Sequence, residues 1–198
     1  MSTTTNTRGR YKKSEERRQD ILEAAFEVFR RSGYAASSLN DIAREVGMSQ
    51  PGMMHHFDGK LAMLQAVLER RDQLAVDRLA GRRGVDWLRG LVEIDEANRT
   101  QRGVVQLYTT LAAEAVTDDH PVKPYFSARF AEVVGTTARA FEEVREDGLL
   151  RPSLDPRAAA IRLISTTEGM QLLWLHGHEV DIAAEVRALI DSMLTRPL

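Results

Sequence analysis

Apolar residues recur along most of the chain at the three- and four-residue spacing that is typical of amphipathic α-helices. The first segment with this pattern begins at Ser14 and closes at Gly33. Its apolar positions are Ile21, Ala25, Val28 and Phe29. The spacing therefore predicts a first helix over this segment. Residues 1–13 are rich in Ser, Thr, Arg and Lys, show no apolar period, and are expected to be disordered.

Two short helical segments follow the first. Residues 38–41 have the form of a capping box with Asp in place of Glu, and Gly47 ends the helix that they begin. Ser49 is a natural N-cap for the next segment, and Pro51 is acceptable in a first turn that needs no amide donor there. Two short helices joined by a tight turn after another helix predict a helix-turn-helix over residues 39–57. Ordinary helical hairpins inside bundles have the same spacing, so spacing alone leaves both interpretations open.

The rest of the chain continues in helical spacing. The predicted segments are residues 60–79, 85–97, 104–116, 121–145, 156–176 and 182–194. No stretch shows the alternation of a strand bounded by hairpin turns, and no internal repeat is visible. The sequence therefore predicts an all-α protein with about nine helices. The last segment has a wide apolar stripe that must be buried, formed by Ile182, Val186, Leu189, Ile190, Met193 and Leu194.

The composition is that of a globular protein. A length of 198 residues with 43% hydrophobic side chains is ample for a packed core. The chain has no cysteine, which excludes disulfides, thiol nucleophiles and thiolate metal sites and suits a reducing compartment. The first apolar run, residues 21–29, is interrupted by Glu23 and Glu27, so neither a signal peptide nor a membrane span is expected. We therefore expect a cytoplasmic protein with no membrane partner.

The net charge of −2 is unevenly distributed along the chain. Residues 1–60 carry ten basic and eight acidic side chains, a net charge of +2, and the remainder carries −4. Six of the ten basic residues lie between Arg8 and Arg18. A basic arm of this kind is expected to meet a polyanion such as DNA, in the minor groove or at phosphates, although a solvated tail has the same composition.

Residues 46–57, VGMSQPGMMHHF, combine small, polar and histidine side chains. Ser49 and Gln50 place hydrogen-bonding groups at a helix N-terminus, whose free amides also favour phosphate. Pro51 and Gly52 have little bulk and permit a close approach to base edges. Hydrogen bonds to phosphates are expected from His55, His56 and Lys60. This chemistry favours a helix that contacts DNA.

Residues 33–57, followed by Lys60 and Leu61, resemble the N-terminal domain of the tetracycline-repressor (TetR) family of bacterial regulators. The resemblance extends over about residues 15–64 and includes many points of match. It implies three DNA-binding helices followed by a six-helix domain for ligand binding and dimerisation. The expected parts are a basic arm at 1–13, a helix-turn-helix domain at 14–60, and a ligand-binding and dimerisation domain at 61–198.

The resemblance also implies roles for individual residues. Ser37 and Ser38 match positions that contact phosphate at the start of the second helix. The matched recognition-helix positions are Ser49, Gln50, Pro51, Gly52 and His55, and the matched backbone contacts are His56 and Lys60. Met54 stands where the family usually has a tyrosine that often bonds a phosphate, so one backbone contact is expected to be absent.

The similarity is looser in the C-terminal two-thirds of the chain. Residues 148–156 resemble a frequent family connection into the penultimate helix, and residues 168–175 resemble the body of that helix. In the family the last two helices pair with those of a second subunit, which implies a homodimer and an interface for the stripe in residues 182–194. A two-fold dimer places two recognition helices roughly one DNA turn (~34 Å) apart and predicts a near-palindromic operator.

The family's central helices enclose a pocket for a small-molecule inducer, which implies a mostly apolar cavity with a few polar anchors. The candidate ligand contacts are Trp87, Tyr108, Glu114, Tyr125, Phe126, Phe130, Met170 and Trp174. Glu114 is the best candidate anchor, because a carboxylate on an apolar helix is unfavourable unless ligand, water or His120 satisfies it. Two alternatives stay open, since aromatic stripes also occur as core packing and Glu114 also suits solvent.

Other chemistry has little support in the sequence. Residues 176–181 contain two histidines and two carboxylates, but their spacing matches no standard zinc pattern. No hydrolase motif or phosphate-cradling glycine loop is present, so no metal, cofactor or enzymatic activity is expected. The sequence predicts a repressor that binds a palindromic operator as a homodimer and is released by a small-molecule inducer. The alternatives are an all-α ligand-binding or scaffold protein with a structural helix-turn-helix, and a small helical enzyme acting through Glu114 and His120.

Overall fold

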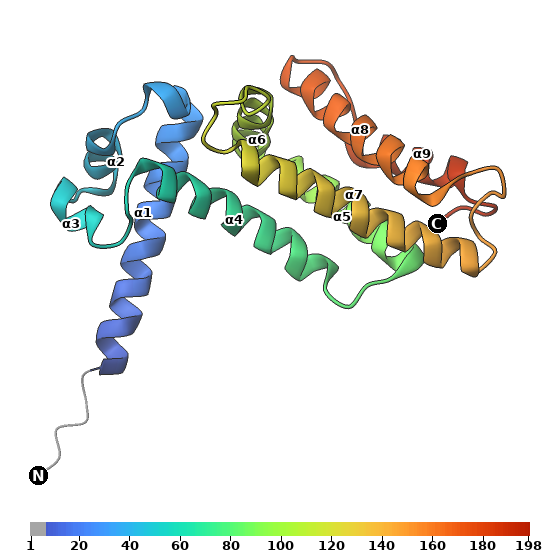
Figure 1. Cartoon of the computed structure of the whole chain (residues 1–198), viewed down its shortest axis with the longest axis horizontal. Coiled ribbons are helices and arrows are strands. Elements are labelled where there is room, and N and C mark those ends of the chain that lie inside the picture. Colours follow the sequence, from blue (N-terminus) through green and yellow to red (C-terminus); the bar gives the residue numbers. More distant parts are fainter. Residues whose placement is uncertain (1–6) are drawn as a thin grey trace, which may run out of the picture. The chain divides into compact units, whose positions relative to one another are not determined.

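The computed structural model describes residues 7–198 (Figure 1). Side chains are described from residue 12 onward. Over this range the regular elements are nine α-helices. They are α1 (Thr7–Ala36), α2 (Leu39–Val46), α3 (Gln50–Met54), α4 (Lys60–Leu79), α5 (Gly84–Asn98), α6 (Arg102–Glu114), α7 (Lys123–Glu146), α8 (Pro156–Leu175) and α9 (Ile182–Met193). An isolated antiparallel bridge joins Leu150 to Leu194, and no strand occurs in the described part of the chain. The predicted all-α fold class is confirmed.

The chain forms two compact units, one extending through Arg71 and the other running from Asp72 to Leu198. The change of unit falls inside α4, so this helix contributes its first part to one unit and its second part to the other. The sequence placed the domain boundary at residues 60/61, where the same helix begins. Each unit has its own buried apolar side chains.

The first unit is built around apolar side chains of α1. Ile21, Ala25 and Val28 are fully buried, at the positions that the helical spacing predicts. Fully buried side chains from the other helices of the unit join them: Ile42 of α2, Met53 of α3, and Met63 and Leu64 of α4. Their burial fixes one side of each short helix in the core.

Helix α1 begins earlier than the sequence predicts. The chain is helical from Thr7, so the expectation of disorder is wrong for residues 7–13, and residues 1–6 lie outside the described residues. Arg and Lys, four of these seven residues, have good helix propensity, and the long helix that follows provides a continuous hydrogen-bonded template. A pair four residues apart adds support, because Lys12 Nζ lies 3.9 Å from Glu16 Oε1.

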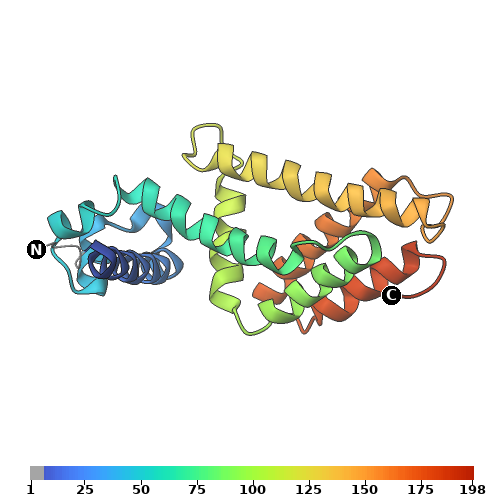
Figure 2. The same ribbon diagram turned by 90° about the horizontal axis from the view of Figure 1, so that it is seen from below.

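The second unit is a bundle in which α5, α7, α8 and α9 share one core. Leu88 of α5, Phe141 of α7 and Leu163 of α8 lie in this core and are at most 1% exposed. Helix α6 packs beside α8 and runs across the direction of α7 (Figure 2). The unit therefore combines three long helices and α9 with one transverse helix, α6.

The apolar stripe of α9 is buried within its own unit. Val186, Ile190 and Met193 are 1%, 0% and 4% exposed and belong to the core that α9 shares with α5, α7 and α8. The prediction that this stripe covers a second subunit is therefore wrong for these side chains, because their partners lie in the same chain. Helix α8 instead leaves large apolar side chains exposed, namely Ile161, Leu172 and Leu173.

Candidate DNA-binding site

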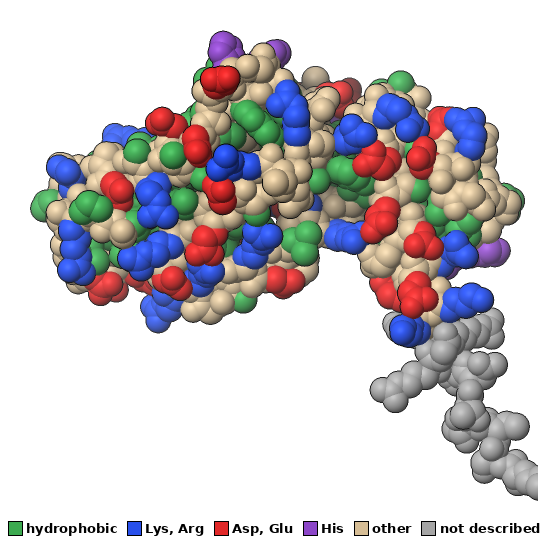
Figure 3. Space-filling model, turned by 180° about the vertical axis from the view of Figure 1, so that it is seen from behind, with side chains coloured by type: hydrophobic (Ala, Val, Ile, Leu, Met, Phe, Trp, Pro, Cys, Tyr) green, Lys and Arg blue, Asp and Glu red, His purple; other side chains and the backbone are tan. Residues whose placement is uncertain are grey.

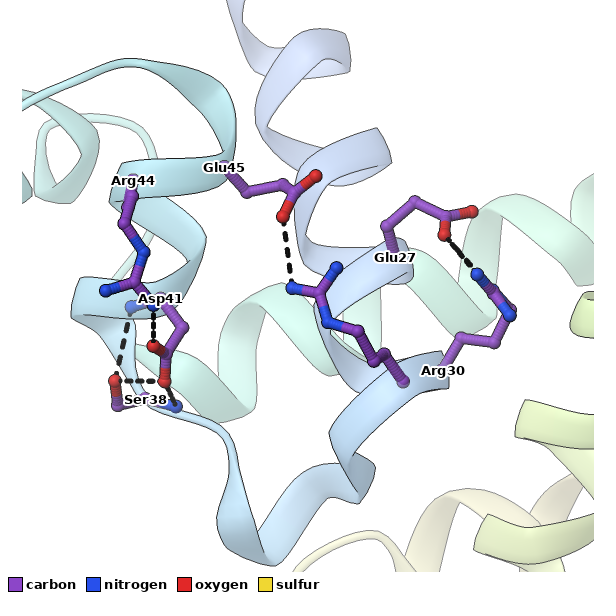
Figure 4. Close-up of polar contacts among 7 residues, drawn as sticks. Glu27, Arg30, Ser38, Asp41, Arg44 and Glu45 are labelled. Carbon is purple, nitrogen blue, oxygen red and sulfur yellow. Dashed lines mark hydrogen bonds and ion pairs between the residues drawn. The ribbon is translucent and has the colours of Figure 1, made fainter.

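Helix α2 is held at its N-terminus by the predicted capping box (Figure 4). Ser38 Oγ accepts a hydrogen bond of 3.2 Å from the Asp41 amide, and the Ser38 amide donates one of 3.1 Å to Asp41 Oδ2. Arg44 forms an ion pair with the other oxygen of this carboxylate. The hydrogen bond from the Ser38 hydroxyl is the main cause that holds the pKa of Asp41 below its ordinary value, and Arg44 contributes in the same direction.

The turn between α2 and α3 depends on Gly47. Its φ of 69° and ψ of 35° lie in the left-handed region, which residues with a Cβ atom rarely adopt. In this conformation the Met48 amide donates a hydrogen bond of 2.9 Å to the carbonyl of Ala43. The predicted glycine stop of α2 is confirmed, and the chain is turned directly into α3.

Helix α3 also has a side-chain cap. Ser49 Oγ accepts a hydrogen bond of 3.2 Å from the Gly52 amide, and Pro51 stands in the first turn, as predicted. A Cβ atom at position 52 would lie 3.1 Å from Ser49 Oγ. Glycine at position 52 therefore leaves room for the Ser49 cap. This local role is a second reason for a glycine here, besides the close approach to DNA that the sequence predicts.

The short helix α3 has one buried side and one open side. Met53 is fully buried and Phe57, just beyond the helix, is 6% exposed. Ser49, Pro51 and His55 are exposed. The half-buried positions are Gln50, Gly52, Met54 and His56. The core thus orients α3 so that its small and polar residues face outward.

Lys60, expected to contact the DNA backbone, is engaged within the first unit. Its Nζ donates hydrogen bonds of 2.6 Å to the carbonyl of Tyr34 and 2.8 Å to the carbonyl of Ser37, and lies 4.3 Å from the Tyr34 ring centroid. These contacts stabilise the turn that begins at Gly33, where the chain leaves the helical conformation with φ 73°. Two of the three ammonium donors therefore already have acceptors, and the phosphate contact stays a prediction.

The serine hydroxyls at the start of α2 have partners within the unit as well. Ser37 is 5% exposed, and its Oγ donates a hydrogen bond of 2.8 Å to the Tyr34 carbonyl. Ser38 Oγ donates to Asp41 Oδ2 at 2.6 Å while it accepts from the Asp41 amide. Both side chains support the local turn, and their predicted phosphate contacts are not tested by this geometry.

Basic side chains around the helix-turn-helix are partly engaged. Arg31 Nη2 lies 3.1 Å from Glu45 Oε2, which joins α1 to α2 (Figure 4). The Arg18 guanidinium lies 4.2 Å from the ring centroid of Phe57. On the face drawn in Figure 3, acidic and basic side chains of the described residues are interspersed.

Four of the candidate ligand residues form an aromatic cluster in the second unit. The ring of Phe126 lies 5.0 Å from that of Tyr108, 5.1 Å from that of Tyr125 and 6.2 Å from that of Phe130, measured between centroids. Tyr108 and Phe126 are only 3% exposed. These rings pack on one another between α6 and α7, as one of the two sequence-based alternatives proposed. Contact with a ligand stays a prediction.

The other candidate ligand residues lie apart from that cluster. Trp87 and Met170 pack against the core of α5, α7, α8 and α9, and the Nε1 atom of Trp87 is buried without a hydrogen-bond partner. Glu114 is the last residue of α6; its side chain is 43% exposed, and Oε2 lies 3.8 Å from His120 Nε2. The Glu114 carboxylate is therefore accessible to solvent and does not require a ligand. Trp174 lines a cavity.

This cavity, of about 520 Å³, lies within the second unit, near the ends of α5 and α8 and the start of α6. Its volume falls in the range of roughly 300–1,000 Å³ found for small-molecule sites. Asp95 and Gln171 also line it and are 6% and 4% exposed. Sequence analysis missed both, because a single polar residue in a helical segment gives no signal of whether it faces solvent or a cavity.

A second feature missed by sequence analysis is Asp72 of α4. Its carboxylate accepts a hydrogen bond of 2.7 Å from Arg129 Nε and a further one from the Tyr125 hydroxyl, both on α7. Burial first, and then the hydrogen bond to Asp72, raise the pKa of Tyr125. The partners are 53 and 57 positions from Asp72 in sequence, so no local pattern links them.

Two further features of the described residues bear on function. They contain no group of three or more His, Cys, Asp or Glu side chains placed to hold a metal ion. None of the described helices combines the length and the apolar character needed to cross a membrane.

Comparison with known proteins identifies the first unit. Residues 21–67 match the family model described as "Bacterial regulatory proteins, tetR family". The HTH-type transcriptional regulator SrpR of Pseudomonas putida is 47% identical over 58 residues, which are 29% of this chain and 27% of SrpR. The chain aligns with less than half of the length of the first curated relatives that it matches, between 27% and 43%.

Other relatives align with most of the chain. UidR, an HTH-type transcriptional regulator of Escherichia coli K12, is 24% identical over 187 residues, 90% of this chain and 93% of UidR. SmeT, the repressor of the Stenotrophomonas maltophilia multidrug efflux pump SmeDEF, is a solved structure with a TM-score of 0.74 and 20% identity over 90% of each chain. A transcriptional regulator from Saccharomonospora viridis, solved in complex with choline, has a TM-score of 0.78 and 23% identity and covers 92% of this chain and 100% of its own.

These structural likenesses show the same all-helical fold. The relatives are transcriptional regulators rather than enzymes. The matched family domain contains the capped α2 and α3 and the glycine turn between them. Residues 21–67 are therefore identified as the helix-turn-helix DNA-binding domain of the TetR family of transcriptional regulators.

Proposed function

We propose that this regulator is a cytoplasmic repressor, which binds a near-palindromic operator as a homodimer and is released by a small molecule bound to its second unit. The observation that carries the proposal is the geometry of α3. Met53 anchors one side of this capped helix in the core, while Ser49, Pro51 and His55 are open. A short helix with small and polar groups facing outward suits the major groove. SmeT, which shares the fold, is a repressor.

The proposed DNA contacts lie on α3 and at its ends. The Gln50 side chain is assigned to base reading, because an amide can pair with two atoms of adenine in the major groove. Pro51 and Gly52 allow the backbone to come close, and Ser49, His55 and His56 are assigned to phosphates. Ser37, Ser38 and Lys60 contribute at least indirectly, because they hold the α1–α2 turn.

The proposed dimer forms through α8 and α9. Ile161 and Leu172 of α8 are 44% and 49% exposed and are separated by about three helical turns, so they lie on the same side of the helix. Leu173, also 49% exposed, extends this apolar strip. Exposed apolar strips of this kind are typical of protein interfaces. The outward-facing sides of α8 and α9 therefore replace the buried α9 stripe as the proposed contact.

Release by a small molecule requires two forms of the protein that differ in affinity for DNA. The ligand must bind the form with low DNA affinity more tightly, because a ligand with equal affinity for both shifts nothing. Linkage then requires operator and ligand to weaken each other's binding by the same factor. The S. viridis protein shows that a regulator of this fold was solved with a small molecule, choline.

The test is selection of bound sequences from a random duplex pool with the full chain, followed by fluorescence anisotropy of the selected duplex over a salt series. We expect a two-fold symmetric sequence and an affinity that falls steeply with salt. Gln50→Ala should change the selected sequence, whereas Gln106→Ala, an exposed glutamine on α6, should leave it unchanged. Recovery of no preferred sequence would reject the operator-binding proposal.

A further inference from the structure

The cavity of about 520 Å³ in the second unit reaches from the packed interior to the solvent. Val105 of α6 and Ile182 of α9 line it and are 1% and 8% exposed, so they belong to the interior. Arg99 and Asp181 line it as well, and their side chains are 56% and 52% exposed. A small molecule can therefore bury an apolar part in this cavity and keep a charged part hydrated at its open side.

Carboxylates outnumber guanidinium groups in the wall of this cavity. The lining residues that carry a formal charge are Asp95, Glu179, Asp181, Arg99 and Arg102. Three carboxylates against two guanidinium groups give the wall a net charge of −1. His178 also lines the cavity and is counted as neutral at pH 7. The wall is therefore acidic.

A fourth carboxylate adds to this excess. Arg99 Nη1 lies 3.0 Å from Glu96 Oε1, which is outside the wall, and 3.9 Å from Asp181 Oδ2. Four carboxylates then stand against two guanidinium groups, a net charge of −2. With the buried carboxyl of Asp95 counted as protonated, the net charge is still −1. The sign of the charge therefore does not depend on Asp95.

The guanidinium of Arg102 shows that one corner of the wall already holds a cation. Its Nη1 and Nη2 donate hydrogen bonds of 3.1 Å and 2.6 Å to the carbonyls of Trp174 and Leu175, at the end of α8. The same guanidinium lies 5.0 Å from the Trp174 ring centroid. Carbonyls at the C-terminal end of a helix and the face of an indole ring both attract positive charge. Backbone and aromatic groups therefore act in the same direction as the carboxylates.

Attraction of a cation by this wall does not require that any single carboxylate is directed at the ligand. The Debye length at physiological ionic strength is about 8 Å, so charges on several sides of a small cavity act together on a bound ion. The same excess repels an anion and gives an uncharged molecule no advantage. The wall charge therefore selects the sign of the ligand, and the buried apolar side chains supply affinity.

We propose that this cavity binds an organic cation with one positive charge and a small apolar body, an alkyl- or arylammonium. The inference rests on the proposed function, since it gives the location and the charge of the molecule that releases the repressor. The apolar body lies against Val105 and Ile182, in the buried part of the cavity. The ammonium group lies toward the open side, where Glu179 and Asp181 are.

The experiment compares probes of one shape and three charges by isothermal titration calorimetry of the full chain, at about pH 8, where imidazole is mostly neutral. The probes are benzylammonium, benzyl alcohol and phenylmethanesulfonate, with benzyltrimethylammonium as a bulkier cation. We expect at least one cation to bind the native chain about tenfold or more tightly than the alcohol, and the anion to bind more weakly than the alcohol. The preference for the cation should shrink as the salt concentration rises from about 0.05 M to about 0.5 M.

Two substitutions in the wall should change cation binding in opposite directions. Glu179→Gln, at an exposed position, should weaken it about threefold or more, and Arg99→Gln should strengthen it by a similar factor. Benzyl alcohol is the internal reference, because a changed fold would alter its binding as well.

Glu142→Gln is the matched control, because it removes an exposed carboxylate at the far end of α5. The neighbouring Glu143 accepts a hydrogen bond of 2.7 Å from the amide of Gly84, the first residue of that helix. The cavity lies at the other end of α5, so about 20 Å separates it from this position. This variant should leave the affinity of every probe unchanged.

Four results would overturn the proposal. They are that no ammonium probe binds, that cation and alcohol bind equally, that the anion binds most tightly, or that the preference for the cation is unchanged in both Glu179→Gln and Arg99→Gln. Each of these results would show that the wall charge does not select the ligand.

Operator binding in the same preparations separates this inference from the repressor proposal. Intact operator binding without a preference for the cation rejects the ligand site alone. A preference for the cation in a chain that selects no DNA sequence rejects the repressor and keeps the cavity as a binding site for this class of molecule.

Discussion

Arg129 Nε lies 2.7 Å from a carboxylate oxygen of Asp72, and this pair joins α7 to α4 inside the second unit. Both side chains are 19% exposed, so water screens their attraction only partly. The hydroxyl of Tyr125 donates to the same carboxylate.

Removal of the Asp72 charge is expected to destabilise the second unit. In Asp72→Asn the Arg129 guanidinium keeps its shielded position without a counter-charge, and we expect a loss of about 1–3 kcal/mol in the free energy of unfolding. Urea unfolding followed by circular dichroism measures it. Asp20→Asn is the matched control, because its pair with Arg17 is roughly half-exposed and should be worth less than about 0.5 kcal/mol. Equal losses in both variants would contradict this assignment.

The cap of α2 is expected to contribute measurably to the first unit. Ser38→Ala removes the acceptor for the Asp41 amide, and we expect the free energy of unfolding to fall by about 1 kcal/mol and the affinity for operator to fall with it. Ser127→Ala, at an exposed position within α7, is the control and should have little effect on either quantity. If Ser38→Ala lowers the free energy of unfolding but leaves the operator affinity unchanged, DNA binding itself would be the cause that orders α2.

The lowered pKa of Asp41 predicts a pH dependence with a defined sign. A carboxyl whose pKa is lower in the folded chain stabilises the fold above its ordinary pKa, and this stabilisation disappears as the pH falls through the lowered value. We therefore expect the Tm of the native chain to fall more than that of Asp41→Asn as the pH decreases from about 5 to about 2. Parallel Tm curves over this range would mean that the capping box does not perturb the titration.

Lys60 distinguishes a structural role from a direct DNA contact. Lys60→Met removes the donor to the carbonyls of Tyr34 and Ser37, and we expect a loss of about 1–3 kcal/mol in the free energy of unfolding. If the ammonium acts only through this turn, the slope of log affinity against log salt stays unchanged. A slope shallower by about one would instead assign Lys60 to a phosphate, as the family resemblance implies.

The exposed strip of α8 predicts where the proposed dimer is sensitive to charge. Leu172→Glu should yield a folded monomer, measured by light scattering and circular dichroism, because it places a carboxylate in the proposed interface. Leu74→Glu changes an exposed leucine of α4 and should leave the oligomeric state unchanged. A charge at Ile190 is unsuitable, since that side chain is fully buried in its own unit and the chain would unfold. A dimeric Leu172→Glu variant would exclude this strip.

Local interactions explain why so much of the first unit was predictable. The capping box at Ser38, the glycine turn at Gly47 and the cap at Ser49 each involve residues within about four positions, so the residue types alone specify the conformation. The helical period placed Ile21 and Val28 in the core for the same reason. The start of α1 was missed because polar residues without an apolar period extended an existing helix.

The helical elements, their capping and turn residues and the DNA-binding domain could all be predicted from the residues alone, because these features depend on neighbours along the chain. The packed structure was needed to show that the α9 stripe faces its own core, that Lys60 donates a hydrogen bond to the Tyr34 carbonyl, and that Asp95 and Gln171 line a cavity. Helical spacing specifies that a side of a helix is apolar but not which surface covers it. That choice depends on contacts between residues distant in sequence, where packing and hydrogen bonding compete across the whole unit.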